Sequence, residues 1–354
     1  MIKILVVNPG STSTKIGYFE GENQKFDETL RHTTEELAPF EKIADQYSFR
    51  MGIIEAFLKK KEIDVAELSA VVGMGGLIKP VIGGTYEVND AMARDLKAGV
   101  SGEHASNLGG LISYEIGKKI GVPAYIVDPV VVDEFADISR ISGHPLLTRI
   151  SIFHALNQRA MAHQFCTEQG LQYENTNLVV VHMGGGISVG IHNQGRVIDA
   201  NNALDGDGPF TPERSGGLPA GELVKLCFSG EHTLPDIKKM LKGKGGMSAY
   251  FDTNDMREIS ERAKKEPKVK LVLDAFVYQI AKEIGAMATA VNGKVDGIIL
   301  TGGIAYDSHI VEEITKRVSF ISRVQAYPGE NELMALAGGA LRVLTGKEKA
   351  KIYE

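Results

Sequence analysis

The sequence predicts an α/β protein of two domains related by duplication. Its 354 residues exceed what a single hydrophobic core normally accommodates, so two domains are expected. Short apolar runs alternate with segments of helical spacing, which is the pattern of an α/β fold. A glycine-containing tip between two apolar runs occurs at 5–19 and again at 177–191. This recurrence predicts that the second half repeats the first.

The first half opens with a β-hairpin, because β-branched and apolar residues at 2–7 and 16–19 flank a polar tip. Spacing and turn residues then predict a helix over 37–61, a strand over 69–76, a hairpin over 81–88, a helix over 103–119, a strand over 124–129 and a helix over 146–169.

The second half begins with the same order of elements. His182 takes the place of Asn8, and Ser188 takes that of Lys15. The apolar run 296–304 contains Gly-Gly near its end, as does 69–77. Helices are expected over 221–229, 233–242, 254–265, 269–291 and 331–345, the last of them returning to the first domain. The predicted domains are therefore 1–145 with 331–354, and 146–330.

The composition excludes several classes of partner. A net charge of −6 offers no basic face for nucleic acid. Cys166 and Cys227 stand far apart, which indicates neither a thiolate metal cluster nor a disulfide framework. No stretch approaches ~18 uncharged apolar residues, and the N-terminus has no cleavable signal. We expect a cytoplasmic protein without membrane or nucleic-acid partners.

The two glycine tips suit phosphate. Glycine lets the backbone approach an anion, and successive N–H groups form an anion-binding concavity. In the first tip, NPGSTSTK at 8–15, the hydroxyls of Ser11, Thr12 and Ser13 add donors and Lys15 adds charge. A surface turn is the alternative, because the same residue types favour turns. The pattern G-x-x-x-x-G-K-S/T is absent and the first tip leads into a strand, so phosphate binding here would use β-hairpins.

The order of motifs resembles the acetokinase family of carboxylate kinases, within the acetate and sugar kinase, heat-shock chaperone and actin superfamily. The matching motifs are NPGSTSTK (8–15), HASN (104–107), FH (153–154), HMGGGIS (182–188), FTPERSGG (210–217), TGGI (301–304) and NELMALAGGA (331–340). The first tip and the run ERSGGLP resemble the family's butyrate-specific branch more than its acetate-specific branch. The resemblance implies two ribonuclease-H-like domains, as in actin-like ATPases, with the active site in the cleft between them.

The resemblance also implies roles for individual residues. Those implied to bind the nucleotide and its phosphates are Asn8, Ser11, Ser13, Lys15, Gly184, Gly185, Gly186, Gly302, Gly303 and Ile304. Those implied to take part in catalysis are Arg214, His154, His182 and Asp128. His104 and Asn107 are implied to bind the acyl substrate, and Asp128 and Glu332 to hold Mg²⁺.

Each of these roles has a plainer alternative. A guanidinium suits the charge that phosphoryl transfer spreads over three oxygens, which favours a catalytic role for Arg214 over a surface salt bridge. His154 and His182 could be hydrogen-bonded core residues. Asp128 ends a buried strand, where ligand sites of α/β sheets gather, whereas Glu332 could simply complement a helix dipole.

Two departures from the acetate-specific pattern stand out. Gly185 replaces an asparagine, which removes one side-chain donor. No arginine occurs between Leu68 and Leu77 to hold the substrate carboxylate, which leaves Lys79, backbone N–H groups or a group elsewhere for that task.

The predicted activity is the reversible, Mg²⁺-dependent phosphorylation of a short-chain carboxylate by ATP, with butyrate preferred and an acyl phosphate and ADP as products. The resemblance further implies a homodimer or higher homo-oligomer. Kinases for isobutyrate, propionate or acetate remain alternatives within the family. A sugar kinase or an actin-like ATPase is the alternative outside it. A sugar kinase needs a catalytic Asp to deprotonate its hydroxyl substrate and often carries a zinc-binding cysteine cluster, which this sequence lacks.

Overall fold

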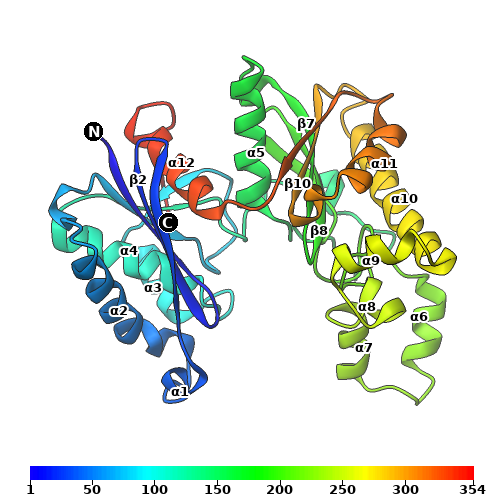
Figure 1. Ribbon diagram of the computed structural model, residues 1–354, viewed down its shortest axis with the longest axis horizontal. Coiled ribbons are helices and arrows are strands. Elements are labelled where there is room, and N and C mark those ends of the chain that lie inside the picture. Colours follow the sequence, from blue (N-terminus) through cyan, green and yellow to red (C-terminus); the bar gives the residue numbers. More distant parts are fainter. The chain divides into compact units, whose positions relative to one another are not determined.

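The chain forms two compact units in the computed structural model, which describes residues 1–354 (Figure 1). The first unit comprises Met1–Asp133 and Asn331–Glu354, and the second comprises Glu134–Glu330. The boundary between the units lies at 133/134 and not at the expected 145/146, because Glu134 and Ala136 are hydrogen-bonded to the second unit. The Val197 N–H donates to Glu134 Oε2 at 2.8 Å, and the Ala136 N–H donates to the Ile198 carbonyl at 2.9 Å. None of the helices is long and apolar enough to cross a bilayer.

The first unit contains a seven-stranded sheet of order β12-β5-β6-β4-β1-β2-β3. Its strands are β1 (Lys3–Pro9), β2 (Ser13–Glu20), β3 (Asn23–Arg31), β4 (Ala70–Met74), β5 (Thr85–Glu87), β6 (Ala124–Val127) and β12 (Lys351–Ile352). β1 and β2 form the predicted antiparallel hairpin, while β1, β4 and β6 run parallel. The carboxyl ends of these three strands therefore meet at one edge of the sheet.

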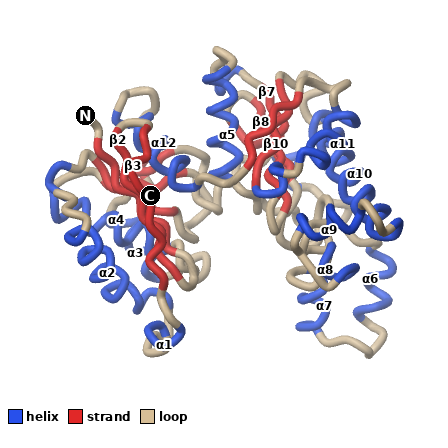
Figure 2. Tube along the Cα trace, in the orientation of Figure 1, coloured by secondary structure: helices blue, strands red, loops and turns tan.

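Helices cover both faces of this sheet (Figure 2). They are α2 (Tyr47–Lys60), α3 (Asp90–Ala98), α4 (Asn107–Ile120) and α12 (Glu332–Leu344), whereas the short α1 (Thr34–Leu37) buries no residue. Leu5 and Val7 of β1 pack against α2 and α4 in one apolar cluster. Gly17 of β2 lies against Leu333 of α12, so the opposite face is covered by the C-terminal helix, drawn in red beside the blue strands in Figure 1.

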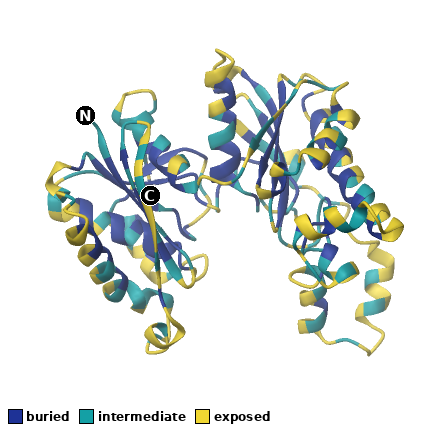
Figure 3. Cartoon of the chain, in the orientation of Figure 1, coloured by how far each residue is buried: buried dark blue, intermediate teal, exposed yellow.

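The second unit contains a five-stranded sheet of order β11-β10-β7-β8-β9. The strands are β7 (Asn177–Met183), β8 (Ile187–Asn193), β9 (Arg196–Ala200), β10 (Gly297–Gly302) and β11 (Val324–Pro328). Val179 and Val181 pack against α10 on one face, whereas Leu178 and Val180 pack against α5 on the other. The strands are thus buried between layers of half-exposed helices (Figure 3).

The helices of the second unit are α5 (Ala155–Glu168), α6 (Ala220–Cys227), α7 (Leu234–Leu241), α8 (Gly246–Phe251), α9 (Met256–Ala263), α10 (Pro267–Thr289) and α11 (Ser308–Val318). Short 3-10 turns span Ile43–Gln46, Val65–Glu67, Asp137–Arg140, Tyr173–Asn175 and Gly303–Tyr306.

The predicted duplication is visible in the strand order. β3-β2-β1-β4-β6 of the first sheet corresponds to β9-β8-β7-β10-β11 of the second. The register agrees as well, because Asn8 pairs with Lys15 in the first hairpin and His182 pairs with Ser188 in the second. The α/β fold of two related sheets is therefore confirmed.

Three predicted elements differ from the structure. Residues 81–88 form no hairpin, since only β5 is extended there and it pairs with β6 and β12. The helix expected over 37–61 begins at Tyr47, and the helix expected over 146–169 begins at Ala155. The segment before Ala155 is irregular because its polar groups bond to other elements, as when the Arg149 guanidinium donates to Asp199 at 2.9 Å.

Candidate active site

The first glycine tip is held from behind by a buried arginine. Arg50 of α2 is 1% exposed, and its guanidinium donates to the carbonyls of Gly10 and Ser13 at 2.8 Å and of Ser11 at 3.0 Å. Its remaining side-chain partners are neutral, namely the Gln46 carbonyl at 2.8 Å and the Thr14 hydroxyl at 3.2 Å. A positive charge therefore lies directly behind the loop, whose Ser11 is exposed.

The carboxyl edge of the first sheet collects three of the predicted residues. Asn8 at the end of β1 donates from Nδ2 to Glu332 Oε2 at 2.6 Å. Asp128 follows β6, is 3% exposed, and accepts the Gly84 N–H at 2.7 Å. Its φ of 39° is sparsely populated for a residue with a side chain, and such backbone strain tends to gather at functional sites.

The predicted acyl-binding residues lie in different surroundings. Asn107 accepts the Leu77 N–H at 2.8 Å and donates to the Gly102 carbonyl at 3.0 Å, so its amide holds the backbone of the turn after β4. His104 is exposed, and its Nδ1 accepts the Ser106 N–H at 3.2 Å. Lys79 lies 3.4 Å from Asp95.

The second glycine tip contacts the loop that carries Arg214. A Cβ at Gly186 would lie 1.9 Å from Arg214 Nη1, so only glycine lets the guanidinium lie there. The Thr211 hydroxyl donates to the Gly185 carbonyl at 2.7 Å and accepts the Arg214 N–H at 2.9 Å. Arg214 Nη1 also donates to the Ala203 carbonyl, while its Nε is buried without a partner. The guanidinium, which is permanently charged, therefore lies against the second glycine tip.

His154 and His182 stack beside this loop, with ring centroids 3.7 Å apart and planes at 12°. His182 Nδ1 lies 2.8 Å from Asn157 Oδ1, and its Nε2 lies 3.1 Å from Glu330 Oε1. Burial lowers the pKa of His154 well below its ordinary value, and the nearby His182 and Arg214 lower it further. His154 is therefore neutral at physiological pH. The hydrogen bond from His182 lowers the pKa of Glu330.

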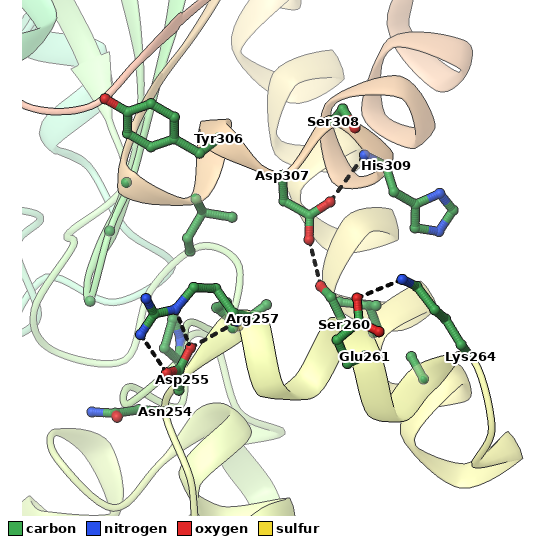
Figure 4. A pocket seen from close by; sticks show the side chains of 18 of the residues that line it. Asn254, Asp255, Arg257, Ser260, Glu261, Lys264, Tyr306, Asp307, Ser308 and His309 are labelled. Atoms are coloured by element: carbon green, nitrogen blue, oxygen red, sulfur yellow. Dashed lines mark hydrogen bonds and ion pairs between the residues drawn. The ribbon is translucent and has the colours of Figure 1, made fainter.

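A pocket of about 1290 Å³ opens from the second glycine tip (Figure 4). Gly184, Gly185, Gly303 and Ile304 line it, which places four of the predicted residues on one cavity. Gly302, at a φ of 89°, lies behind it, where a Cβ would meet the Met183 carbonyl oxygen at 2.4 Å.

The other walls of this pocket come from residues that sequence analysis did not single out. Asp255 caps α9 and accepts from Arg257 at 2.7 Å, while Ser260 donates to Asp307 at 2.5 Å (Figure 4). Asp255 lay within a predicted helix, and an Asp at a helix start is a recognisable capping signal. The convergence of that helix start with Tyr306 and Glu330 on one cavity depends on the tertiary fold.

Comparison with known proteins identifies the family. The sequence pattern of the acetokinase family matches residues 146–332. A probable butyrate kinase of Clostridium botulinum is 56% identical over 99% of both chains. The chain belongs to the acetokinase family. Butyrate kinase 1 of Clostridium acetobutylicum is 55% identical over the full length of both chains. The crystal structure of Porphyromonas gingivalis acetate kinase matches 96% of this chain and 99% of that one with a TM-score of 0.75 at 19% identity.

Membership of the acetokinase family makes this protein a phosphotransferase with a carboxyl group as acceptor. The structural likeness adds that the two sheets form the actin-like ATPase fold of the family's kinases.

Proposed function

We propose that this protein phosphorylates butyrate with ATP, giving butanoyl phosphate and ADP, and that it also catalyses the reverse reaction. Relatives named as butyrate kinases that are 55–56% identical along the whole chain support this substrate. The chemistry rests on one observation, which is the position of the Arg214 guanidinium against the second glycine tip.

In the proposed reaction, a butyrate oxygen attacks the γ-phosphorus of ATP. The new O–P bond forms as the bond to the β–γ bridging oxygen breaks, and ADP leaves with that electron pair. No general base is required, because a carboxylic acid with a pKa of about 4 is already ionised at neutral pH. Arg214 and His154 donate to the equatorial oxygens, where negative charge is distributed during transfer.

We propose that the nucleotide occupies the pocket next to Gly184 and Gly303. The glycine backbone lets phosphate oxygens approach the N–H groups of the tip. Arg257 and Tyr306 offer a guanidinium plane and an aromatic face at the same pocket, both of which stack on purine bases. The first glycine tip is proposed to bind phosphate as well. Its Ser11, Ser13 and Lys15 lie in the loop that the buried Arg50 charge supports from behind.

We propose that magnesium binds at the carboxyl edge of the first sheet. No group of three His, Cys, Asp or Glu side chains forms a closed metal site. Mg²⁺ in nucleotide enzymes uses only one or two carboxylates besides phosphates and water, so a closed cluster of protein ligands is not required. When bound, the ion would neutralise phosphate charge. Asp128, buried at a strand end, and Glu332, oriented by Asn8, are the residues proposed to hold it.

The test is a hydroxamate assay that traps acyl phosphates. The protein is incubated with MgATP, hydroxylamine and one of butyrate, isobutyrate, propionate or acetate, and the coloured product is compared with ADP release. We expect butyrate to give the highest kcat/KM, and Arg214→Gln to abolish the colour. ATP consumption with glucose or N-acetylglucosamine and none with any carboxylate would overturn the proposal. Consumption without an acceptor would point to an ATPase.

A further inference from the structure

A chain of side-chain hydrogen bonds runs through the interior of the second unit and ends at His154. Gln158 of α5 lies in the middle of this chain and is fully buried. Gln158 Nε2 lies 3.0 Å from the Ser188 carbonyl and 2.8 Å from the Ser188 hydroxyl. A backbone carbonyl can only accept, so the amide nitrogen of Gln158 must face it. The orientation of this amide is therefore fixed by the backbone.

The orientation of Gln158 determines the proton on His192. The Gln158 carbonyl oxygen lies 3.1 Å from His192 Nε2 and can only accept, so Nε2 carries the proton. His192 Nδ1 then accepts from the Tyr173 hydroxyl at 2.8 Å. Burial lowers the pKa of His192 to about 3, helped by the nearby Arg159 charge, so the ring holds a single proton.

The Ser188 hydroxyl has three neighbours, and two of them can only donate. These are the Gln158 amide at 2.8 Å and the His154 backbone N–H at 3.3 Å. The third neighbour is His154 Nδ1, at 2.8 Å. If His154 Nδ1 carried its proton, the Ser188 hydroxyl hydrogen would be buried without an acceptor, which is costly. The hydroxyl therefore donates to Nδ1.

We propose that Ser188 and Gln158, supported by His192 and Tyr173, are positioning residues that keep His154 in the form protonated at Nε2. Every bond of the chain points the same way, from Tyr173 through His192, Gln158 and Ser188 to His154. Aligned hydrogen bonds strengthen one another at low dielectric. His154 thus presents a fixed Nε2–H donor, and under the proposed function that donor serves the transferring phosphoryl group.

The first arm of the test needs no substrate. Protein labelled with ¹⁵N-histidine reports the proton position of each ring in two-bond N–H correlation spectra near neutral pH, and His154 is assigned by its loss in His154→Gln. We expect protonation at Nε2 in the wild type and a mixture of both forms in Ser188→Ala. Ser113→Ala is the matched control, since it deletes an equally buried hydroxyl that has no partner. A proton on Nδ1 in the wild type, or an unchanged ring in Ser188→Ala, would overturn the proposal.

The second arm is kinetic and rests on the proposed function. We expect Ser188→Ala to lower kcat about tenfold with KM for MgATP changed less than about twofold, because the donor is misdirected rather than removed. In a protein that already carries His154→Gln, Ser188→Ala should lower kcat no further. Additive losses would overturn the positioning role. If no carboxylate is phosphorylated at all, the proposed function fails while the spectroscopic arm still decides the proton position.

Discussion

Acid should destabilise this protein through His192, because burial gives this ring a lower pKa in the folded chain than in the unfolded chain. Its pKa falls from the ordinary 6.5 to about 3 in the folded chain. Between these values the unfolded chain binds a proton that the folded chain excludes, so stability is lost as the pH falls. At 1.36 kcal/mol for each unit of pKa, the loss from His192 is about 2 kcal/mol between pH 7 and pH 5 and about 5 kcal/mol below pH 3.

Urea unfolding followed by far-UV circular dichroism measures this loss at each pH. We expect His192→Gln to be less stable than the wild type at pH 7 but to lose about 2 kcal/mol less on going to pH 5. His309→Gln, which removes an exposed ring of the same unit, is the control and should follow the wild type. Equal pH dependence in His192→Gln and the wild type would show that the buried ring is not the cause.

Three further changes probe the proposed site. Gly186→Ala would place a Cβ 1.9 Å from Arg214 Nη1 and should lower kcat about 100-fold without changing the circular dichroism spectrum, whereas Gly221→Ala, whose Cβ would meet nothing within 4 Å, should retain full activity. Arg50→Lys loses the planar fork that binds three loop carbonyls, so KM for ATP should rise and stability should fall by about 2–3 kcal/mol in urea; an unchanged KM would argue against the loop's role. Asp128→Asn tolerates the same positive φ but removes the charge, so a Mg²⁺ titration of activity should shift more than about tenfold, and an unshifted titration would exclude this carboxylate as a ligand.

The sequence predicted the sheets well where strands are buried on both faces. β1, β4, β7 and β10 appear as unbroken apolar runs, which turn residues delimit clearly. β3 escaped prediction because it is an edge strand of mostly polar residues with little burial. The helix α3 escaped although Asn89 caps its start and Gly99 its end, which are ordinary helix signals.

The candidate site was predictable in its motifs and unpredictable in its contacts. The glycine tips and Arg214 lie in local patterns, and the structure brings Gly186 and Arg214 together. The role of Arg50 could not be predicted from the sequence. Its contact with the first tip arises only because the tertiary fold places α2 behind that tip. The donors behind His154 depend likewise on distances between α5 and β8 that no spacing along the chain encodes.

The first unit is assembled from both ends of the polypeptide, because β12 adds the edge strand to the sheet that contains β1, and α12 covers one face of that sheet. During translation, all of residues 134–330 are therefore synthesised before α12 and β12 become available to the first unit. The second unit can thus form its core while the sheet of the first unit still lacks α12 on one face. A nascent protein stalled before Asn331 should therefore expose to chaperones the apolar residues of β1 and β2 that α12 covers.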